Sequence, residues 1–274
     1  MSLAPLDFEY LRSLVKDHTA IVIDSGKEYL AETRLAQLVS EQGCASLQDF
    51  VGLLRRESFS GLHRKVLDAM TNNETWFFRD SHPFAALTEV VIPQLMERRS
   101  AQRQIAIWCA ACSSGQEPYS IAMGVREKFN LPDWRFSIRA TDFSNTVLQR
   151  AKSGVYRQME VNRGLPAKLL TRYFVQQGLN WQLKPEVRNM VSFGFLNLAE
   201  PWGNLVPPAD VVFLRNVLIY FDVETRKAIL GRVRRVLAPD GFLFLGCAET
   251  TLNLDSEFER VQTGNYVGYK IKDR

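Results

Sequence analysis

Apolar residues in the first 70 positions recur at helical spacing. The first group that falls on one helical face is Leu6, Tyr10, Leu11, Leu14 and Val15. Three later groups repeat the spacing: Ala31, Leu35, Leu38 and Val39; Phe50, Leu53 and Leu54; and Leu62, Val66, Leu67 and Met70. Gly43 is a stop signal for the second helix, and Ser46 with Asp49 resembles a capping box at the start of the third. The pattern predicts a helical domain over residues 1–70.

Beyond about residue 100, short apolar runs alternate with amphipathic stretches. The strand candidates are Gln104–Ala110, Phe136–Thr141, Val211–Leu214 and Phe242–Leu245. The helix candidates are Pro118–Phe129, Asn145–Lys152 and Val223–Leu237, with caps expected at Ser144, Gly154 and Asp222. This alternation is typical of a parallel sheet covered on both faces. Two last runs, Phe258–Gln262 and Tyr266–Ile271, indicate an antiparallel edge hairpin turning at Thr-Gly-Asn.

Residues 155–195 depart from the alternation. They contain a short helix around Ala167–Phe174 and strand-like pieces around Trp181 and Val187–Phe193, which predict a small β insertion. The expected organisation is therefore a helical domain (1–70), a linker (71–85) and an α/β domain (86–274) that carries the insertion at about 155–195.

Composition and charge narrow the class of protein. Hydrophobic residues make up 46% and charged residues 23%, which is ordinary for a soluble globular chain. The sequence has no apolar run of about 18 residues, and its N-terminus has early acids and no apolar signal core, so we expect a cytoplasmic protein. The net charge of +4 permits an acidic partner without indicating nucleic acid.

Cys109 and Cys112 form a Cys-x-x-Cys spacing, but the other two cysteines, Cys44 and Cys247, are isolated. The three histidines show no ligand spacing, so we expect no metal site. A redox pair would begin at a helix N-terminus, whereas Cys109 ends a strand-like run. The spacing is therefore interpreted as incidental.

The loop after the first strand, Cys109–Gly115, consists almost entirely of small residues and suits a ligand that presses on backbone. It matches neither a dinucleotide fingerprint nor a P-loop, and Glu117 would repel a pyrophosphate. Asp142, at the end of the second strand, stands where ribose hydroxyls are accepted; the alternative is a turn or helix-capping aspartate. Two carboxylates without phosphate chemistry suit a cationic nucleoside, and S-adenosylmethionine fits this description.

Two further segments follow strand-like runs. Asn197, followed by Leu198, places an amide where it could bind an adenine edge. Arg215–Tyr220 follows the fourth strand and faces the transferable group. Adenine N-methyltransferases commonly carry Asn-Pro-Pro-Tyr at this place, and its absence weakens the case for an exocyclic-amine substrate.

These stretches together resemble one family, the chemotaxis receptor glutamate O-methyltransferases (CheR), over nearly the whole chain. The most specific match is TNNETWFFR at Thr71–Arg79, which fits the family pattern Asn-x-Thr-x-Phe-Phe-Arg. AACSSGQEPYSIAM, ATDFSNTVLQRAKSGVY, RYF and FLRNVLIYFD follow in family order. The resemblance implies a Rossmann-like class I S-adenosylmethionine-dependent methyltransferase sheet, an all-helical N-terminal domain and a small inserted β-subdomain.

The resemblance also implies the site residues. The cofactor-binding positions are Asn73, Thr75, Arg79, Glu117, Asp142, Asn197, Leu198, Arg215 and Asn216. Arg79 and Tyr220 match catalytic positions beside the methyl group and the incoming carboxylate; the alternative for Tyr220 is aromatic packing. Cys112 and Gln116 occupy positions that the family also fills with Ala and Glu.

The implied reaction methylates glutamates on acidic helices of chemoreceptor cytoplasmic domains and leaves S-adenosylhomocysteine. Glutamate has a pKa of about 4.3 and is ionised at neutral pH, so no general base is required. Arg55, Arg56, Arg64 and Lys65 form a candidate docking face or only a solvated helix surface. The short connection QQGLNWQLKPE argues against tethering by a receptor peptide. We expect a monomer without nucleic acid or membrane insertion; the rival hypotheses are a methyltransferase for a small carboxylic acid or RNA and a non-catalytic cofactor-binding module.

Overall fold

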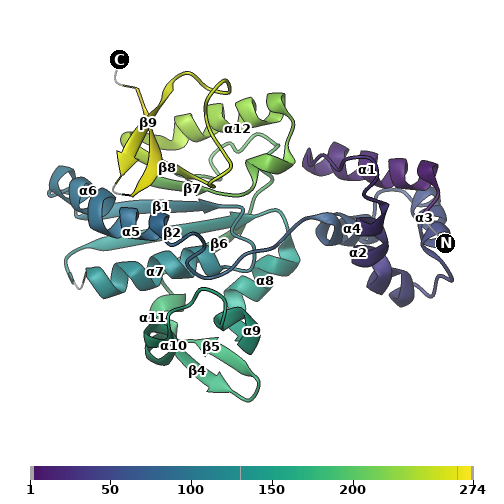
Figure 1. Cartoon of the computed structure of the whole chain (residues 1–274), viewed down its shortest axis with the longest axis horizontal. Helices are drawn as coiled ribbons and strands as arrows, with labels where there is room; N and C mark the ends of the chain where they lie inside the picture. The colour runs from purple at the N-terminus through teal and green to yellow at the C-terminus, as the bar shows by residue number, and fades with distance from the viewer. Residues whose placement is uncertain (1–2, 130, 264, 273–274) are drawn as a thin grey trace. The chain divides into compact units, whose positions relative to one another are not determined.

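Short helices build the N-terminal unit of the computed structural model, which describes residues 3–129, 131–263 and 265–272 (Figure 1). They are α1 (Pro5–Thr19), α2 (Glu28–Glu41), α3 (Leu47–Arg56) and α4 (Gly61–Met70). The unit comprises Met1–Asn72 together with Tyr220–Thr225, and the remaining residues form the second unit. Residues 220–225 join the helices through an antiparallel bridge between Ile21 and Phe221.

The helical periodicity predicts most of this core. Ala31, Leu35, Val66 and Leu67 are buried, and the Ser46 side chain accepts a hydrogen bond from the Asp49 N–H at 3.1 Å. The prediction that Leu6 lies on the buried face of α1 is wrong. Leu6 is 78% exposed, and Phe8 is buried in α1 instead. At 3.6 residues per turn, Leu6 lies about 200° around the helix from Phe8, on the opposite face.

Among the described residues, the second unit contains a mixed sheet of seven strands. Its order is β6-β2-β1-β7-β8-β10-β9. The strands are β1 (Gln104–Ala110), β2 (Arg135–Asp142), β6 (Val191–Phe195), β7 (Ala209–Leu214), β8 (Leu237–Leu245), β9 (Phe258–Thr263) and β10 (Tyr266–Ile271). Pairs from β6 to β8 are parallel, and β10 is antiparallel to both β8 and β9. The predicted parallel sheet with an edge hairpin is confirmed, although Gly264 of the predicted turn lies outside the described residues.

Helices connect and cover the strands. They are α5 (His82–Ala86), the π-helical turn η1 (Leu87–Val91), α6 (Ile92–Arg98), α7 (Gln116–Lys128), α8 (Asn145–Ser153), the 3₁₀ turn η2 (Leu218–Tyr220) and α12 (Val223–Val236). The three expected caps are confirmed: the Ser144 and Asp222 side chains accept backbone N–H groups, and Gly154 adopts a left-handed conformation. The helical segment at 82–98 was not predicted, although its buried residues Leu87, Val91 and Leu95 keep helical spacing.

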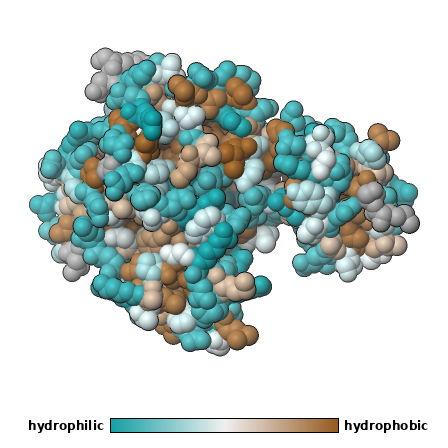
Figure 2. Space-filling view, in the orientation of Figure 1, coloured by the Kyte–Doolittle hydropathy of each residue, from teal (hydrophilic) through white to brown (hydrophobic). Residues whose placement is uncertain are grey.

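A second sheet of three strands forms the inserted β-subdomain. Its order is β3 (Val155–Arg157), β5 (Asn180–Leu183) and β4 (Phe174–Gln177), and it is flanked by α9 (Gln158–Val161), α10 (Ala167–Tyr173) and α11 (Pro185–Arg188). The predicted extent of 155–195 needs one correction, because Val191–Phe195 is β6 and pairs with β2 of the main sheet. Hydrophobic residues show on this subdomain in Figure 2. Leu179, in the β4–β5 turn, is 89% exposed.

The predicted Rossmann-like α/β fold, with a helical N-terminal domain and a small inserted β-subdomain, is thus confirmed. The largest fully buried side chains of the second unit include Trp108, Phe213 and Phe244 on the strands and Tyr119 on α7. No helix in the described parts of the chain combines the length and apolar character needed to cross a membrane.

Arg99 stabilises the edge of the sheet where β7 and β8 begin. Its guanidinium contacts Asp210 at 2.8 Å and Asp240 at 2.6 Å. These ionic hydrogen bonds lower the pKa of Asp240 to about 2, even though partial burial opposes the shift.

We predict that Asp240→Asn lowers the free energy of unfolding at pH 7 by about 2 kcal/mol. Because the folded-state pKa is depressed, this stabilisation is complete above about pH 4 and disappears as the pH falls toward 2. Urea unfolding of both proteins across this range would test the prediction. A difference between the two proteins that does not change with pH would contradict it.

Candidate functional site

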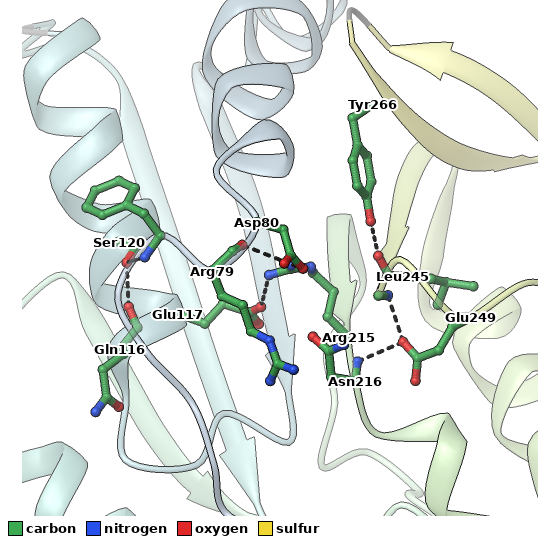
Figure 3. Close-up of polar contacts among 12 residues, drawn as sticks. Arg79, Asp80, Gln116, Glu117, Ser120, Arg215, Asn216, Leu245, Glu249 and Tyr266 are labelled. Atoms are coloured by element: carbon green, nitrogen blue, oxygen red, sulfur yellow. Dashed lines mark hydrogen bonds and ion pairs between the residues drawn. The ribbon is translucent and has the colours of Figure 1, made fainter. Parts of the chain in front are cut away.

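The candidate site lies at the carboxyl ends of β1, β2, β7 and β8, where loops 111–115, 143–144, 215–218 and 246–249 meet. Ligands of open α/β sheets bind at this edge. The segment 73–81 contributes further residues, and Figure 3 shows Arg79 and Asp80 beside Glu117 and Arg215.

Gly115 enables the tight loop that follows β1. Its φ is +91°, a conformation that glycine adopts without strain, and an added Cβ would lie 3.0 Å from the Ala151 Cβ and 3.2 Å from the Tyr156 hydroxyl. Ala111 and Ser113 in the same loop also have positive φ, at 54° and 50°. Such conformations cost free energy in non-glycine residues and concentrate at ligand-binding sites.

Asp142 is a buried carboxylate, 8% exposed, at the end of β2. It accepts hydrogen bonds from the backbone N–H groups of Ser113 at 2.8 Å and Ser144 at 2.9 Å. The structure therefore shows the turn-stabilising role that was the alternative interpretation. A carboxylate has about four acceptor positions, so the role in binding ribose is compatible with these bonds and stays a prediction.

Arg215 is the most buried charged group of the site, with 1% of its side chain exposed. Its guanidinium contacts the carboxylates of Glu117 at 2.9 Å and Asp80 at 2.6 Å, and it also donates to the Arg79 carbonyl. Burial raises the pKa of Glu117, and the Arg215 charge opposes that rise. Asp80 was missed by the sequence analysis, where no local pattern distinguishes it from a surface acid.

Arg79 is held by an aromatic contact. Its guanidinium carbon lies 4.2 Å from the centre of the Trp76 ring, and that of Arg163 lies 3.9 Å from the same ring. Arg163 also pairs with Glu74 at 2.9 Å. The close approach of the two segments requires Gly164, where an added Cβ would lie 2.0 Å from the Phe77 carbonyl oxygen. Trp76 is the second missed residue, because it occupies a variable position of the motif.

The motif segment also contacts the loop after β1. The Ser113 hydroxyl donates to the Asn73 carbonyl at 2.7 Å, so the backbone of the motif lies against the loop that contains Gly115. Thr75 is half-buried between Asn73 and Arg79 along this segment. The structure therefore brings the predicted positions Asn73, Thr75 and Arg79 to the same edge of the sheet as Glu117.

Asn197 and Leu198 follow β6 and are both buried. The Asn197 side-chain oxygen accepts the Ala199 N–H at 3.1 Å, and its amide donates to Glu200 at 3.1 Å. Asn216 has a φ of +57°, and its N–H donates to the Glu249 carboxylate at 2.7 Å. The Asn197 loop is thus stabilised by its own hydrogen bonds, and the Asn216 loop by a bond to the loop after β8.

Tyr220 belongs to the helical unit. Its hydroxyl accepts a hydrogen bond from the Asn72 side chain at 2.6 Å, and its carbonyl accepts one from the Val22 N–H at 2.8 Å. Tyr220 is therefore more than an aromatic packing residue, since its hydroxyl is engaged. Its role in methyl transfer stays a prediction.

Cys109 and Cys112 are free and fully buried. Burial raises the pKa of both thiols well above the usual range, so they are neutral at physiological pH. A neutral buried thiol is a small apolar residue and neither a metal ligand nor a nucleophile. No group of three or more metal-ligating side chains occurs in the described part of the chain.

We predict that replacing both Cys109 and Cys112 with alanine leaves cofactor affinity largely unchanged, at a cost of about 1 kcal/mol in the free energy of unfolding. In contrast, Glu117→Ala should weaken cofactor binding at least about tenfold, because a carboxylate of the site is lost. Isothermal titration calorimetry with S-adenosylhomocysteine measures both affinities. The interpretation would be wrong if the cysteine variant lost affinity as strongly as the glutamate variant.

Family comparisons agree with this geometry. The model of the CheR methyltransferase S-adenosylmethionine-binding domain matches residues 73–267, and the model of the CheR all-alpha domain matches residues 6–71. The chain belongs to the CheR methyltransferase family.

Relatives of this CheR-family chain align with it over almost its full length. It is 42% identical over 277 residues to chemotaxis protein methyltransferase 1 of Pseudomonas aeruginosa, covering 99% of this chain and 100% of the relative. It is 40% identical, with the same coverage, to chemotaxis protein methyltransferase Cher2 of Pseudomonas putida. A chemotaxis protein methyltransferase of Vibrio parahaemolyticus is 35% identical, with 99% of each chain covered.

S-adenosylmethionine is the cofactor of this methyltransferase, and the site residues fit it. Gly115 leaves a cradle that a Cβ would fill, and Asp142 presents acceptor oxygens beside that cradle. The Nε atoms of Arg79 and Arg215 are buried without hydrogen-bond partners among the described residues. Such donors need an acceptor, and the carboxylate of the cofactor is of the right charge.

Proposed function

We propose that this chain transfers the methyl group of S-adenosylmethionine to glutamate carboxylates on cytoplasmic helices of chemoreceptors. The products are glutamate methyl esters, which would serve adaptation in chemotaxis, and S-adenosylhomocysteine. The observation that carries the proposal is Arg79, an arginine held over Trp76 beside the Glu117–Arg215 pair. A positively charged planar group at this place suits a carboxylate acceptor. The names of the relatives support a chemotactic role.

The proposed cofactor contacts follow from the loops. Asp142 accepts the ribose hydroxyls, and Asn197 with Leu198 binds the adenine. The Glu117 oxygen that is not bonded to Arg215 accepts from the ammonium group of the cofactor. Two of these contacts thus come from the ends of β2 and β6, and the third comes from the first turn of α7. The remaining proposed contacts are Asn73, Thr75, Arg79, Arg215 and Asn216.

The cofactor supplies an electrophilic methyl group on a sulfonium. With the cofactor bound, attack by a glutamate oxygen on this methyl carbon would form the new C–O bond as the C–S bond breaks, and the electron pair would stay on sulfur. No proton moves, which suits a segment, Leu214–Tyr220, that contains neither histidine nor acid. Arg79 orients the attacking carboxylate and Tyr220 donates a hydrogen bond to its second oxygen. Orientation of this kind can contribute about 7–11 kcal/mol in favourable cases.

The functional test is incubation with labelled S-adenosylmethionine and receptor cytoplasmic fragments. We expect base-labile label on receptor glutamates, as methyl esters require. Label on RNA or on a small carboxylic acid instead would favour the corresponding rival methyltransferase. Cofactor binding without transfer to any of these acceptors would indicate a non-catalytic module.

We propose that acidic receptor helices dock on the basic surface formed by Arg56, Arg64 and Lys65, which are exposed in the helical unit. Arg55 contributes less, because it pairs with Asp7 at 3.2 Å and stacks on Tyr10. The chain would act as a monomer in the cytoplasm, where these receptor helices lie.

Charge reversal at Arg56 and Lys65 should raise the KM for receptor about tenfold at low salt without changing cofactor affinity. Leaving Arg55 intact avoids repulsion with Asp7 inside the helical unit. A matched control reverses Lys128 and Lys272, two exposed lysines of the catalytic unit. Receptor KM and its salt dependence are measured for both variants, and equal values for the two would rule out the docking surface.

A further inference from the structure

Glu249 makes an unusual set of hydrogen bonds. One carboxylate oxygen accepts the backbone N–H groups of Asn216 and Gly246, both at 2.7 Å. The other accepts those of Val217 at 2.9 Å and Leu218 at 2.7 Å. A single side chain thus connects the loop after β7 to the end of β8, as Figure 3 shows for Asn216 and Glu249.

These donors need such an acceptor. The strands end at Leu214 and Leu245, so the N–H groups that follow have no partner in the sheet. Hydrogen bonds to an ionised carboxylate are shorter and stronger than neutral ones. They stabilise Asn216 in its left-handed conformation, with φ of +57°, a region that asparagine enters more readily than most non-glycine residues.

Gly246 shows how closely the two loops approach. A Cβ added there would lie 2.6 Å from the Asn216 Nδ2, 2.7 Å from a Glu249 carboxylate oxygen and 2.9 Å from the Asn216 N. No side chain can enter this space unless the loop moves. The carboxylate and the glycine therefore act on the same feature, the position of Asn216.

We infer that Glu249 is a positioning residue for methyl transfer. It acts through the loop that carries Arg215 and Asn216, and Arg215 in turn contacts Glu117 at 2.9 Å. This inference rests on the proposed function, because it assigns to Glu249 the geometry of that same site. Displacing the loop would move two proposed cofactor contacts together and would misalign the methyl group with its acceptor.

The main test variant is Glu249→Gln in the full-length protein. One amide oxygen cannot accept four N–H groups, and the new NH₂ group faces donors, so the loop must shift. We expect kcat for receptor methylation to fall about 100-fold, as small misplacements can produce. The Kd for S-adenosylhomocysteine should rise about tenfold, which corresponds to 1.4 kcal/mol. Glu249→Asp, which keeps the charge, should recover part of both losses.

Gly246→Ala tests the same loop without removing the carboxylate, and it should lower kcat and cofactor affinity in the same direction. Two matched controls should leave kcat and cofactor affinity unchanged. They are Glu259→Gln, at an exposed position of β9, and Gly231→Ala, at a position of α12 where an added Cβ meets no atom within 4 Å. Thermal unfolding is measured for every variant, with activity assayed well below each midpoint.

The outcomes separate the two hypotheses. If the wild-type chain binds cofactor but does not methylate receptor, the proposed function fails, and the Kd values still test the loop. If Glu249→Gln and Gly246→Ala lose only thermal stability and keep wild-type kcat and Kd, the positioning role is overturned. If Glu249→Gln does not fold, Glu249→Asp and Gly246→Ala decide by the same criteria.

Discussion

Replacing Arg215 with alanine is expected to abolish measurable cofactor binding and to lower the free energy of unfolding by about 3–5 kcal/mol. The side chain is 1% exposed and lies between the carboxylates of Glu117 and Asp80. Its removal leaves two acids, one of them deeply buried, without the cation that both of them contact. Chemical denaturation and calorimetry with S-adenosylhomocysteine measure the two effects.

The loss of stability in Arg215→Ala should depend on pH. Burial already raises the pKa of Glu117, and removing the arginine raises it further. An acid with a raised folded-state pKa does not destabilise the protein below the ordinary glutamate pKa, where it is protonated in both states. As the pH rises from there through the shifted value, the free energy of unfolding falls. The variant should therefore be closest to wild type near pH 4.5 and furthest from it above the shifted pKa of Glu117.

A triple variant, Arg215→Met with Glu117→Gln and Asp80→Asn, separates stability from function. Without charges to leave unpaired, it should recover much of the lost stability, because apolar and neutral groups can replace a buried ionic cluster. Cofactor binding should remain absent. Normal affinity in Arg215→Ala would show that the buried arginine serves folding alone.

Local patterns predicted much of the fold. The caps at Ser46, Ser144 and Asp222 depend on side chains that bond to backbone within three residues, so the sequence shows them directly. Gly115 was predictable because a run of small residues after a strand requires a tight turn. The parallel pairing of the central strands was predictable from the regular alternation of apolar runs and amphipathic helices, but the order of the strands in the sheet was not.

Contacts between distant segments were harder to predict. Glu249 lies 33 residues from Asn216, and Asp80 lies 135 residues from Arg215, so no spacing in the sequence relates either pair. Val191–Phe195 was assigned to the insertion because its apolar pattern suits either sheet, and only pairing with β2 distinguishes them. Leu6 was misassigned because, near the start of α1, few preceding residues define the buried face.

Arg79→Ala is the second change with a large expected effect, a fall of about 100-fold in kcat for receptor methylation. The guanidinium carbon lies 4.2 Å from the Trp76 ring centre, so the cation is held at the ring before the substrate arrives. Alanine removes the guanidinium, so no positive charge at this position orients the incoming carboxylate. Lysine keeps the charge but has no planar group to stack on the ring, so the kcat of Arg79→Lys should lie between those of Arg79→Ala and the wild type.

Arg163→Ala is the matched control, because it removes the other cation on the same ring and keeps Arg79. Cation–π contacts at exposed positions contribute about 0.5–1 kcal/mol, so we expect less than about a tenfold loss in kcat. Single-turnover rates at saturating cofactor separate transfer from binding, to which Arg79 also contributes. If Arg79→Ala raised only the cofactor Kd and kept the saturated rate, the arginine would serve the cofactor alone. A fall in the saturated rate, graded from arginine through lysine to alanine, requires the guanidinium in the transfer step itself.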